Sequence, residues 1–273
     1  MLNIAIIGLG QVGGSLGKAL KLKFGKYFVV GIDKNPLVLK TAKKIKAADI
    51  VSSSLLAAKD SDIAVICTPV DAISAVYKAL SKTIKPGAII TDAGSVKWQI
   101  ETQNQKLKAK TRSFIGAHPM AGTEKNGIEA ARADMYKEAK VVITNTDKRL
   151  LKQQKRVEAL WKDAGGAIVK MPPKKHDELA ALTSHLPHII AFALNKIYKQ
   201  TQAKNKNVNF LTAGSFKSMT RVAVSSADMW APIFQMNSKN IEKYLKEFIK
   251  ELQVFEKNLN KKNNLKQKIL ACQ

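Results

Sequence analysis

LNIAIIGLGQVGGSLGKALKLKFGKYFVVGID, residues 2–33, joins an apolar run, a glycine-rich turn, an amphipathic segment and a second apolar run that ends in Asp33. This order predicts a β-strand, a helix and a second, parallel strand. Gly8, Gly10 and Gly13 form the pattern GxGxxG directly after the first strand. A pattern of this kind between a strand and a helix is typical of a dinucleotide site. A glycine turn that only packs is the structural alternative.

Each glycine has a separate task in that prediction. Gly8 permits the tight turn, Gly10 leaves room for the pyrophosphate, and Gly13 lets the helix lie close to the strand. Gln11 and Val12 stand between them, where the free N–H groups at the start of the helix would meet the phosphates. We therefore place all five residues in the predicted cofactor site.

Asp33 indicates which dinucleotide the turn would bind. It lies ~20 residues beyond the last glycine, where a carboxylate accepts hydrogen bonds from the ribose hydroxyls and repels a 2′-phosphate. NAD is therefore favoured over NADP. Lys34 is the one feature that could tolerate a phosphate at this position.

Length and composition exclude several classes of protein. A chain of 273 residues that is 45% hydrophobic can bury a substantial core in one large or two ordinary domains. No apolar run approaches the ~20 residues of a membrane span, and the N-terminus has no secretory signal. The two cysteines, Cys67 and Cys272, do not suggest a disulfide framework. We expect a cytoplasmic protein with no membrane partner.

The net charge of +25 would ordinarily raise nucleic acid as a partner. The lysines, however, are scattered over helical faces and the C-terminal tail, and no basic stretch is interleaved with aromatic residues for base stacking. We expect no nucleic-acid function. The positive field would instead attract a polyanionic substrate and cofactor.

Strands and helices alternate through the first part of the chain, as a doubly wound parallel sheet requires. Further strands are predicted at 62–67, 88–92, 114–117, 141–144 and 167–169, and helices at 36–45, 70–82 and 147–164. Residues just past the carboxyl ends of such strands face the ligand crevice. Thr68 and Pro69 follow one of these strands, so we place them in the nicotinamide or ribose pocket. The alternative is a proline that merely ends a strand.

The strand signals stop at Pro172-Pro173, which predicts a Rossmann-type domain over residues 1–171 and an all-helical domain over 172–273. Helices are predicted at 174–202, 211–224 and 229–259. Their apolar residues exceed what a small domain needs, so we expect burial against a second copy of the chain. Residues 256–273 are rich in lysine and asparagine and are expected to fray. The fold class is thus α/β followed by all-α.

Five motifs together resemble the prephenate dehydrogenase family. They are GLGQVGGS (8–15), DAGSVK (92–97), HPMAGTE (118–124), LTSHLPH (182–188) and GSFKSMTR (214–221). They occur in the order and with the spacings of the family, over nearly the whole chain. The resemblance implies a dinucleotide-binding domain followed by a helical dimerisation domain. It also implies oxidative decarboxylation of prephenate to 4-hydroxyphenylpyruvate with NAD, on the route to tyrosine.

The resemblance also implies roles for particular residues. The catalytic histidine falls on His118, the serine that orients it or the substrate hydroxyl falls on Ser95, and the carboxylate-binding arginine falls on Arg221. Further substrate-pocket positions fall on Thr123, Glu124, His176, His185 and His188. An acid commonly stands three residues before the arginine, where this chain has Ser218, so the orientation of Arg221 and the fine substrate preference remain open.

The residue types agree with these roles, although each has a plainer reading. A neutral imidazole at His118 can accept the hydrogen bond of a hydroxyl near pH 7, or it could simply cap a strand end. Ser95 could be a helix N-cap, and Arg221 could form a surface salt bridge. His176, His185 and His188 could instead serve helix packing or a dimer contact. They also invite a zinc reading, but without an HExxH motif or a cysteine pair we predict no metal.

Other functions remain to be compared with this one. Arogenate dehydrogenase, or an enzyme that accepts both substrates, differs only in an amino group where prephenate has a keto group. A dehydrogenase of β-hydroxy or imino acids would use a helical lysine in place of HPMAG. A non-catalytic dinucleotide sensor would not need Ser95, His118 and Arg221 together. The length predicts no fused mutase and no regulatory domain, so any inhibition by tyrosine is expected at the active site.

Overall fold

The first domain is built on a six-stranded parallel sheet. The structure is a computed structural model that describes residues 1–106, 113–123, 125–145 and 147–272. The strands lie in the order β3-β2-β1-β4-β5-β6, with Ile4 of β1 between Val29 of β2 and Ile63 of β4. Their bounds are β1 Leu2–Ile7, β2 Tyr27–Ile32, β3 Ile50–Ser52, β4 Ile63–Ile66, β5 Ile89–Asp92 and β6 Ser113–Ile115. The doubly wound sheet predicted from the sequence is confirmed.

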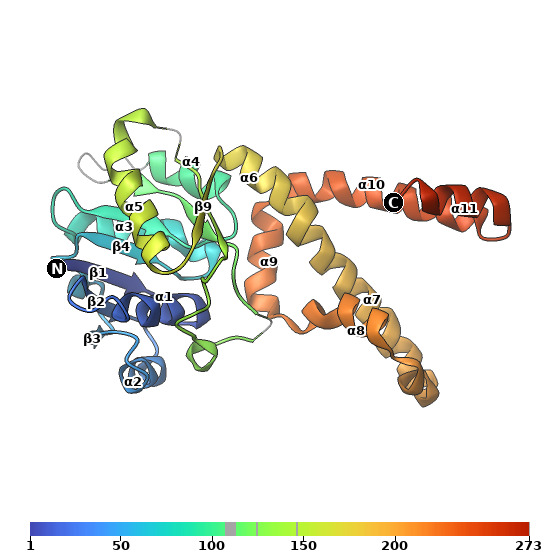
Figure 1. The fold of residues 1–273 in the computed structure, drawn as a ribbon, viewed down its shortest axis with the longest axis horizontal. Coiled ribbons are helices and arrows are strands. Elements are labelled where there is room, and N and C mark those ends of the chain that lie inside the picture. The colour runs from blue at the N-terminus through green and yellow to red at the C-terminus, as the bar shows by residue number, and fades with distance from the viewer. Residues whose placement is uncertain (107–112, 124, 146, 273) are drawn as a thin grey trace.

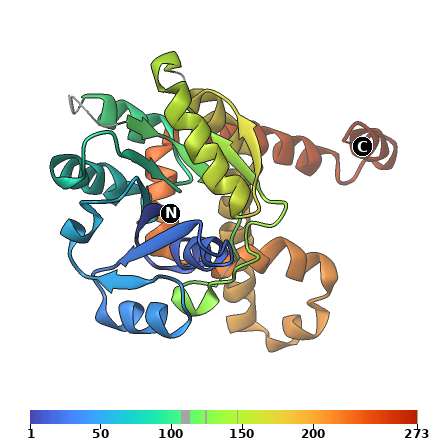
Figure 2. The same ribbon diagram turned by 60° about the vertical axis from the view of Figure 1, so that its left-hand side comes forward.

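Helices cover both faces of this sheet (Figures 1 and 2). One apolar core is formed with α1 Gln11–Lys21, α2 Pro36–Lys44 and α5 Leu151–Asp163. The other is formed with α3 Ile73–Thr83, α4 Trp98–Lys106 and, from the second domain, Trp230 and Ile233. The helical domain therefore shares a core with the sheet.

A second, three-stranded sheet carries the central motif of the sequence. It consists of β7 Ala117–Pro119, β8 Lys140–Ile143 and β9 Ala167–Lys170, with β7 antiparallel and β9 parallel to β8. The strand predicted at 114–117 is divided at Gly116, where the chain leaves one sheet and enters the other. A Cβ on Gly116 would lie 2.3 Å from both Glu101 Oε1 and Thr144 Oγ1, so a larger residue at this crossing would have to displace the buried Glu101–Thr144 contact.

The second domain is helical. It contains α6 Pro173–Ala180, α7 Leu186–Lys204, α8 Gly214–Thr220, α9 Ala227–Met236, α10 Ser238–Asn258 and α11 Lys262–Leu270. Figure 1 shows α7 and α8 projecting in one direction from the sheet and α10 and α11 in another. Within the described residues, no helix is long and apolar enough to cross a membrane.

The helices of the second domain differ from their sequence predictions in four places. The helix predicted at 211–224 is shortened to α8 and is followed by a 3-10 turn, Arg221–Val224. The segment predicted at 174–202 contains a π-helical turn, Ala181–His185, between α6 and α7. The helix predicted at 229–259 is broken at Asn237, which separates α9 from α10. Where fraying was expected, residues 262–270 form helix α11 with every side chain exposed or half-buried.

Candidate functional site

The glycine turn between β1 and α1 has the shape that a dinucleotide requires. Gly8 has a φ of +91°, and a Cβ on Gly13 would lie 1.9 Å from the Gly8 carbonyl oxygen, so the helix can lie this close only with glycine there. Gly10 differs, because nothing lies within 4 Å of its Cβ position. The turn is therefore open on the side where a pyrophosphate would meet the N-terminus of α1.

Asp33 connects this turn to the end of β2. Its Oδ2 accepts a hydrogen bond from the backbone N–H of Leu9 at 2.9 Å, and its Oδ1 accepts one from Asn35 at 2.9 Å. The half-buried carboxylate thus lies beside the glycine turn. Thr68 and Pro69 follow the neighbouring strand β4 at its carboxyl end. These residues share one edge of the sheet with the turn, where a ribose and a nicotinamide would lie.

Gln11 and Val12 link the start of α1 to later parts of the chain. Gln11 Nε2 donates to Thr123 Oγ1 at 2.7 Å, and the backbone N–H of Thr123 donates to Gln11 Oε1 at 3.2 Å. The carbonyl oxygen of Val12 accepts from the hydroxyl of Tyr136 at 2.6 Å. The loop that carries Thr123 is therefore attached to the helix of the glycine turn. Glu124, also predicted for the substrate pocket, lies outside the described residues.

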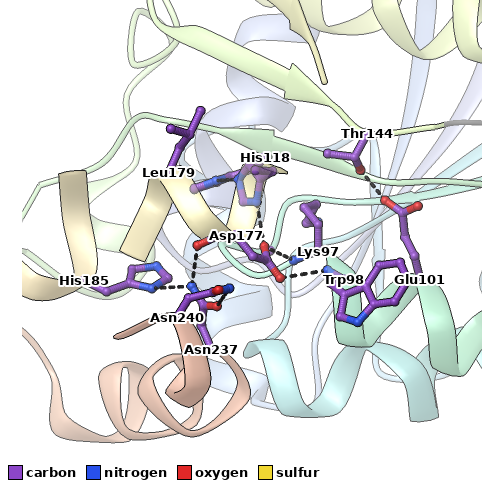
Figure 3. Close-up of polar contacts among 12 residues, drawn as sticks. Lys97, Trp98, Glu101, His118, Thr144, Asp177, Leu179, His185, Asn237 and Asn240 are labelled. Carbon is purple, nitrogen blue, oxygen red and sulfur yellow. Dashed lines mark hydrogen bonds and ion pairs between the residues drawn. The ribbon is translucent and has the colours of Figure 1, made fainter. Parts of the chain in front are cut away.

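His118 stands in the middle of β7, whereas the sequence predicted it just beyond a strand end. Its Nδ1 lies 2.8 Å from His176 Nε2, and His176 Nδ1 lies 2.7 Å from Asp177 Oδ1. Asp177 is buried and also accepts the backbone N–H groups of Lys97 at 2.8 Å and Trp98 at 2.9 Å (Figure 3). Two residues of α6 therefore support the histidine of β7.

This chain of contacts sets which nitrogen of His118 can accept a proton. A carboxylate only accepts, so His176 carries a proton on Nδ1, and in the neutral ring Nε2 is left as an acceptor. His118 must then donate through Nδ1, which leaves its Nε2 lone pair free. Burial, and then the charges of His176, Lys97 and His185, hold the pKa of His118 well below its usual value. The ring is therefore neutral at pH 7 and can act as a proton acceptor.

A buried ion pair fixes β7 to the segment that contains Ser95. Lys97 and Asp92 are both fully buried, and the Lys97 ammonium forms an ion pair with Asp92. Lys97 Nζ also donates to the carbonyl oxygen of Ala117 at 2.7 Å, and the N–H of Ala117 donates to Asp92 Oδ1 at 3.1 Å. Ser95 is half-buried between these two charged residues. The structure thus brings the Ser95 segment against the residue that precedes His118.

The other two histidines lie on the π-helical turn and α7. His185 is buried, and its Nδ1 lies 3.1 Å from Asn237 Nδ2. Burial lowers its pKa to about 4. His188 donates through Nδ1 to the carbonyl oxygen of Ser184 at 2.8 Å and stacks on the Trp230 ring at 3.6 Å between ring centres. All four histidines of the chain therefore lie in one region, since His176 and His188 both act on the pKa of His185.

Arg221 begins a short 3-10 turn after α8 and has an exposed side chain. Together with burial, which is the larger cause, its charge lowers the pKa of His188. Arg221 is thus near the histidines although it lies 103 residues beyond His118 in the sequence. Among the described residues, no group of three or more potential metal ligands is arranged to hold an ion.

The sequence motifs did not identify three residues as members of the site. They are Asp177, Lys97 and Asn237. Asp177 follows His176 directly, and a carboxylate next to a candidate histidine was the available signal. Lys97 belongs to the DAGSVK motif, where a lysine two residues after the serine gave no sign of being buried. For Asn237 the sequence offers no signal, because its partners lie 52 and 60 residues away.

Comparison with known proteins identifies the family. Residues 16–170 match the model described as "Prephenate dehydrogenase, nucleotide-binding domain", and residues 172–269 match "Prephenate dehydrogenase, dimerization domain". The two matches meet at the double proline.

Individual relatives agree with these models. The chain is 33% identical to cyclohexadienyl dehydrogenase of Zymomonas mobilis, over 92% of this chain and 86% of that protein. It is 31% identical to prephenate dehydrogenase of Bacillus subtilis, over 92% and 68%. The crystal structure of A. aeolicus prephenate dehydrogenase with hydroxyphenyl propionate and NAD+ has a TM-score of 0.88 and 32% identity, and covers 100% of this chain and 96% of that one. On these grounds the chain belongs to the prephenate dehydrogenase family, whose members are oxidoreductases.

Proposed function

We propose that this protein oxidises and decarboxylates prephenate to 4-hydroxyphenylpyruvate, with NAD as the hydride acceptor. The observation that carries the proposal is the neutral His118, whose free Nε2 lone pair is set by His176 and Asp177. A reaction that turns a ring hydroxyl into a carbonyl needs an acceptor of this kind. The nicotinamide of NAD, when bound at the glycine turn, would act as the hydride acceptor.

The reaction balances with one acceptor on the protein. Hydride leaves the hydroxyl-bearing ring carbon, and His118 Nε2 takes the hydroxyl proton as that carbon becomes carbonyl-like. The carboxylate on the opposite ring carbon then leaves as carbon dioxide, and its electron pair makes the ring aromatic. His118 returns the proton to the phenolate oxygen. No proton is gained or lost overall, so the histidine only has to hold the proton between the two steps.

The other predicted residues would position the substrate. Ser95 would bridge the hydroxyl and His118, because its segment is tied to Ala117 by Asp92 and Lys97. Arg221 would form a bidentate pair with a substrate carboxylate. His185, His188 and Thr123 would supply further hydrogen bonds, and Glu124 is assigned by the motif alone.

An enzyme that accepts both prephenate and arogenate is the second candidate. It is favoured by the similarity to a protein named cyclohexadienyl dehydrogenase. The two substrates differ at the side chain, away from the ring hydroxyl that His118 would face. The hydrogen-bonded series Asp177–His176–His118, the Asp177 relay, therefore fits both substrates equally.

Turnover of prephenate and of arogenate, each with NAD and with NADP, tests the proposal. We expect the highest kcat/KM with prephenate and NAD, measured by formation of the reduced nicotinamide. Comparable turnover of arogenate would establish the second candidate. Binding of NAD without turnover of either substrate would contradict the proposal and favour a sensor. A preference for NADP would show that Lys34 outweighs Asp33.

We further propose that two copies pair through the helical domain, which matches a family model for dimerisation. The projecting segments expose large apolar side chains: Phe210 is 86% and Leu211 83% exposed, and Ile197 and Val224 are also exposed. Surfaces of this kind mark protein contacts. Sedimentation equilibrium should give the mass of two chains, and a single-chain mass at micromolar concentration would contradict the pairing.

A further inference from the structure

Asn237 occupies the break between α9 and α10 and is 4% exposed. Its Nδ2 lies 2.7 Å from the backbone carbonyl oxygen of Asp177 and 3.1 Å from His185 Nδ1. Its Oδ1 accepts a hydrogen bond from Asn240 Nδ2 at 2.8 Å. Figure 3 shows this amide between His185 and the backbone of Asp177. A buried side chain in the gap between two helices is thus in contact with one of the predicted substrate-binding residues.

The orientation of the amide follows from its partners. A carbonyl oxygen can only accept, so the atom 2.7 Å from the Asp177 carbonyl must be the NH₂ group. That group has two hydrogens, and the second points to His185. His185 Nδ1 must therefore accept, and the neutral ring carries its proton on Nε2.

The groups around His185 disfavour every protonation state except the neutral ring with its proton on Nε2. Protonation of Nδ1 would place an N–H against the NH₂ of Asn237, two donors facing one another. The titratable groups that act on the ring are Asp177, which favours its charged form, and His176 and His188, which disfavour it. Burial also disfavours the charge and is the largest of these causes. Among the described residues, no other hydrogen-bond partner is found for the ring.

We propose that Asn237 is a positioning residue that holds His185 as a neutral Nε2–H donor for an acceptor oxygen of the substrate. This inference rests on the proposed function. It gives the two histidines opposite polarity, since His118 presents an acceptor and His185 a donor. Asp177 sets both: its carboxylate acts through His176, and its backbone carbonyl acts through Asn237. One residue of α6 therefore determines which partner each imidazole can take.

The wild-type protein tests the inference directly. The protonated and lone-pair-bearing nitrogens of a neutral imidazole resonate at well-separated ¹⁵N frequencies, and the chain has only four histidines to assign. We expect His185 to be neutral and protonated on Nε2 at pH 7. A proton on Nδ1 would overturn the inference without any variant, and whatever the result of the turnover assay. The spectrum therefore separates failure of this inference from failure of the proposed function.

The variant Asn237→Asp extends the test to catalysis. A carboxylate beside Nδ1 accepts a hydrogen bond, so His185 should move its proton to Nδ1 or become charged as pH falls. Where the ring is neutral with its proton on Nδ1, we expect KM for prephenate to rise ~10-fold or more through loss of the Nε2–H hydrogen bond to a charged group, with a much smaller change in kcat. KM should also become pH-dependent near neutral pH.

The variant Asn258→Asp is the matched control, since it makes the same change of charge at the last residue of α10, the opposite end of the helix that Asn237 precedes. Asn258 Nδ2 donates only to the carbonyl oxygen of Val254, far from the histidines. We expect the His185 spectrum and KM to stay as in the wild type. An Asn237→Asp protein that keeps the wild-type spectrum and KM would overturn the inference. If that variant fails to fold, the wild-type spectrum still decides.

Discussion

Asp92 and Asp177 are both buried, and both hold the segment between β5 and α4, yet they do different work. Asp92 faces the ammonium of Lys97 and the backbone N–H groups of Gly94 and Ala117, at 3.0 and 3.1 Å. Asp177 faces two backbone N–H groups and the ring of His176. Asp92 therefore pairs with a lysine ammonium, whereas Asp177 pairs with backbone N–H groups and an imidazole.

The difference shows how similar carboxylates can serve structure or chemistry. A buried ion pair fixes geometry, because neither partner can be removed without leaving an uncompensated charge. A carboxylate on a histidine instead decides which nitrogen carries the proton. Asp92 therefore holds β7 in place, while Asp177 determines what His118 on that strand can do. The two can be separated by measuring stability and turnover in the same variants.

The largest expected effect is that of His118→Asn, at the end of the Asp177 relay. An amide cannot take the hydroxyl proton, so kcat should fall by ~10²–10⁴, the usual contribution of a positioned acid or base. The free energy of unfolding and the dissociation constant of NAD should change little. Steady-state kinetics and calorimetric NAD binding provide the measurements. Full kcat in this variant would remove the catalytic assignment.

Lys97→Met tests the Asp92 side of the comparison. It leaves Asp92 buried without its cation, which should lower the free energy of unfolding by ~3–5 kcal/mol in urea. The control is Lys21→Met, because the Lys21 ion pair with Asp49 is partly exposed and should contribute at most ~1 kcal/mol. Equal losses in the two variants would show that burial of the pair is not the source of its effect.

Alongside Asp92 and Asp177, Glu101 on α4 is a third buried carboxyl group. Its contribution to stability is expected to change with pH. Burial raises its pKa from 4.5 to about 7, although it accepts a hydrogen bond from Thr144. Because the folded protein holds this proton more tightly than the unfolded chain, its stabilising effect is complete below about pH 4.5 and is lost as pH rises to about 7. The loss should amount to ~3 kcal/mol.

Urea unfolding at pH 5 and pH 8 measures that loss. Glu101→Gln cannot ionise, so its free energy of unfolding should change less between these pH values than that of the wild type. The exposed Glu129→Gln serves as the control and should keep the wild-type difference. The expected sign would be contradicted if the free energy of unfolding of the wild type, compared with that of Glu101→Gln, rose from pH 5 to pH 8.

Asp177→Asn should produce the smallest of these effects, and mainly on turnover. If its NH₂ group faces His176 Nδ1, the relay reverses, and His118 then carries its proton on Nε2 and cannot accept another. We expect kcat to fall by on the order of 10²-fold, the lower end of what a positioned acid or base contributes. The His118 ¹⁵N spectrum should report the reversal. Loss of stability with an unchanged His118 spectrum would mean that Asp177 resembles Asp92 after all.

The first domain could be predicted from sequence because its signals are local. The glycine turn, Asp33 and the alternation of strands and helices each depend on neighbouring residues. The second sheet was not foreseen as separate, because one residue, Gly116, divides β6 from β7. The break at Asn237 was missed for a similar reason, since a polar residue in an apolar helix pattern does not reveal partners on other elements.

The candidate site was predictable only in part. His118 and the three other histidines were selected by their motifs, and the structure places them together. Their polarity could not be predicted, because it depends on Asp177 and Asn237, which contact them only after folding. The sequence motifs identify the histidines of the site, whereas tertiary hydrogen bonds determine which nitrogen of each imidazole carries the proton.

The projecting helices have a consequence for how this molecule melts. Phe210, Leu211 and Leu252 remain in water in a single chain, and pairing of two chains would remove such surface from solvent. The heat-induced transition then obeys mass action, and its midpoint shifts upward as the sample becomes more concentrated. If two copies pair as proposed, a melting temperature has meaning only together with the chain concentration at which it was recorded.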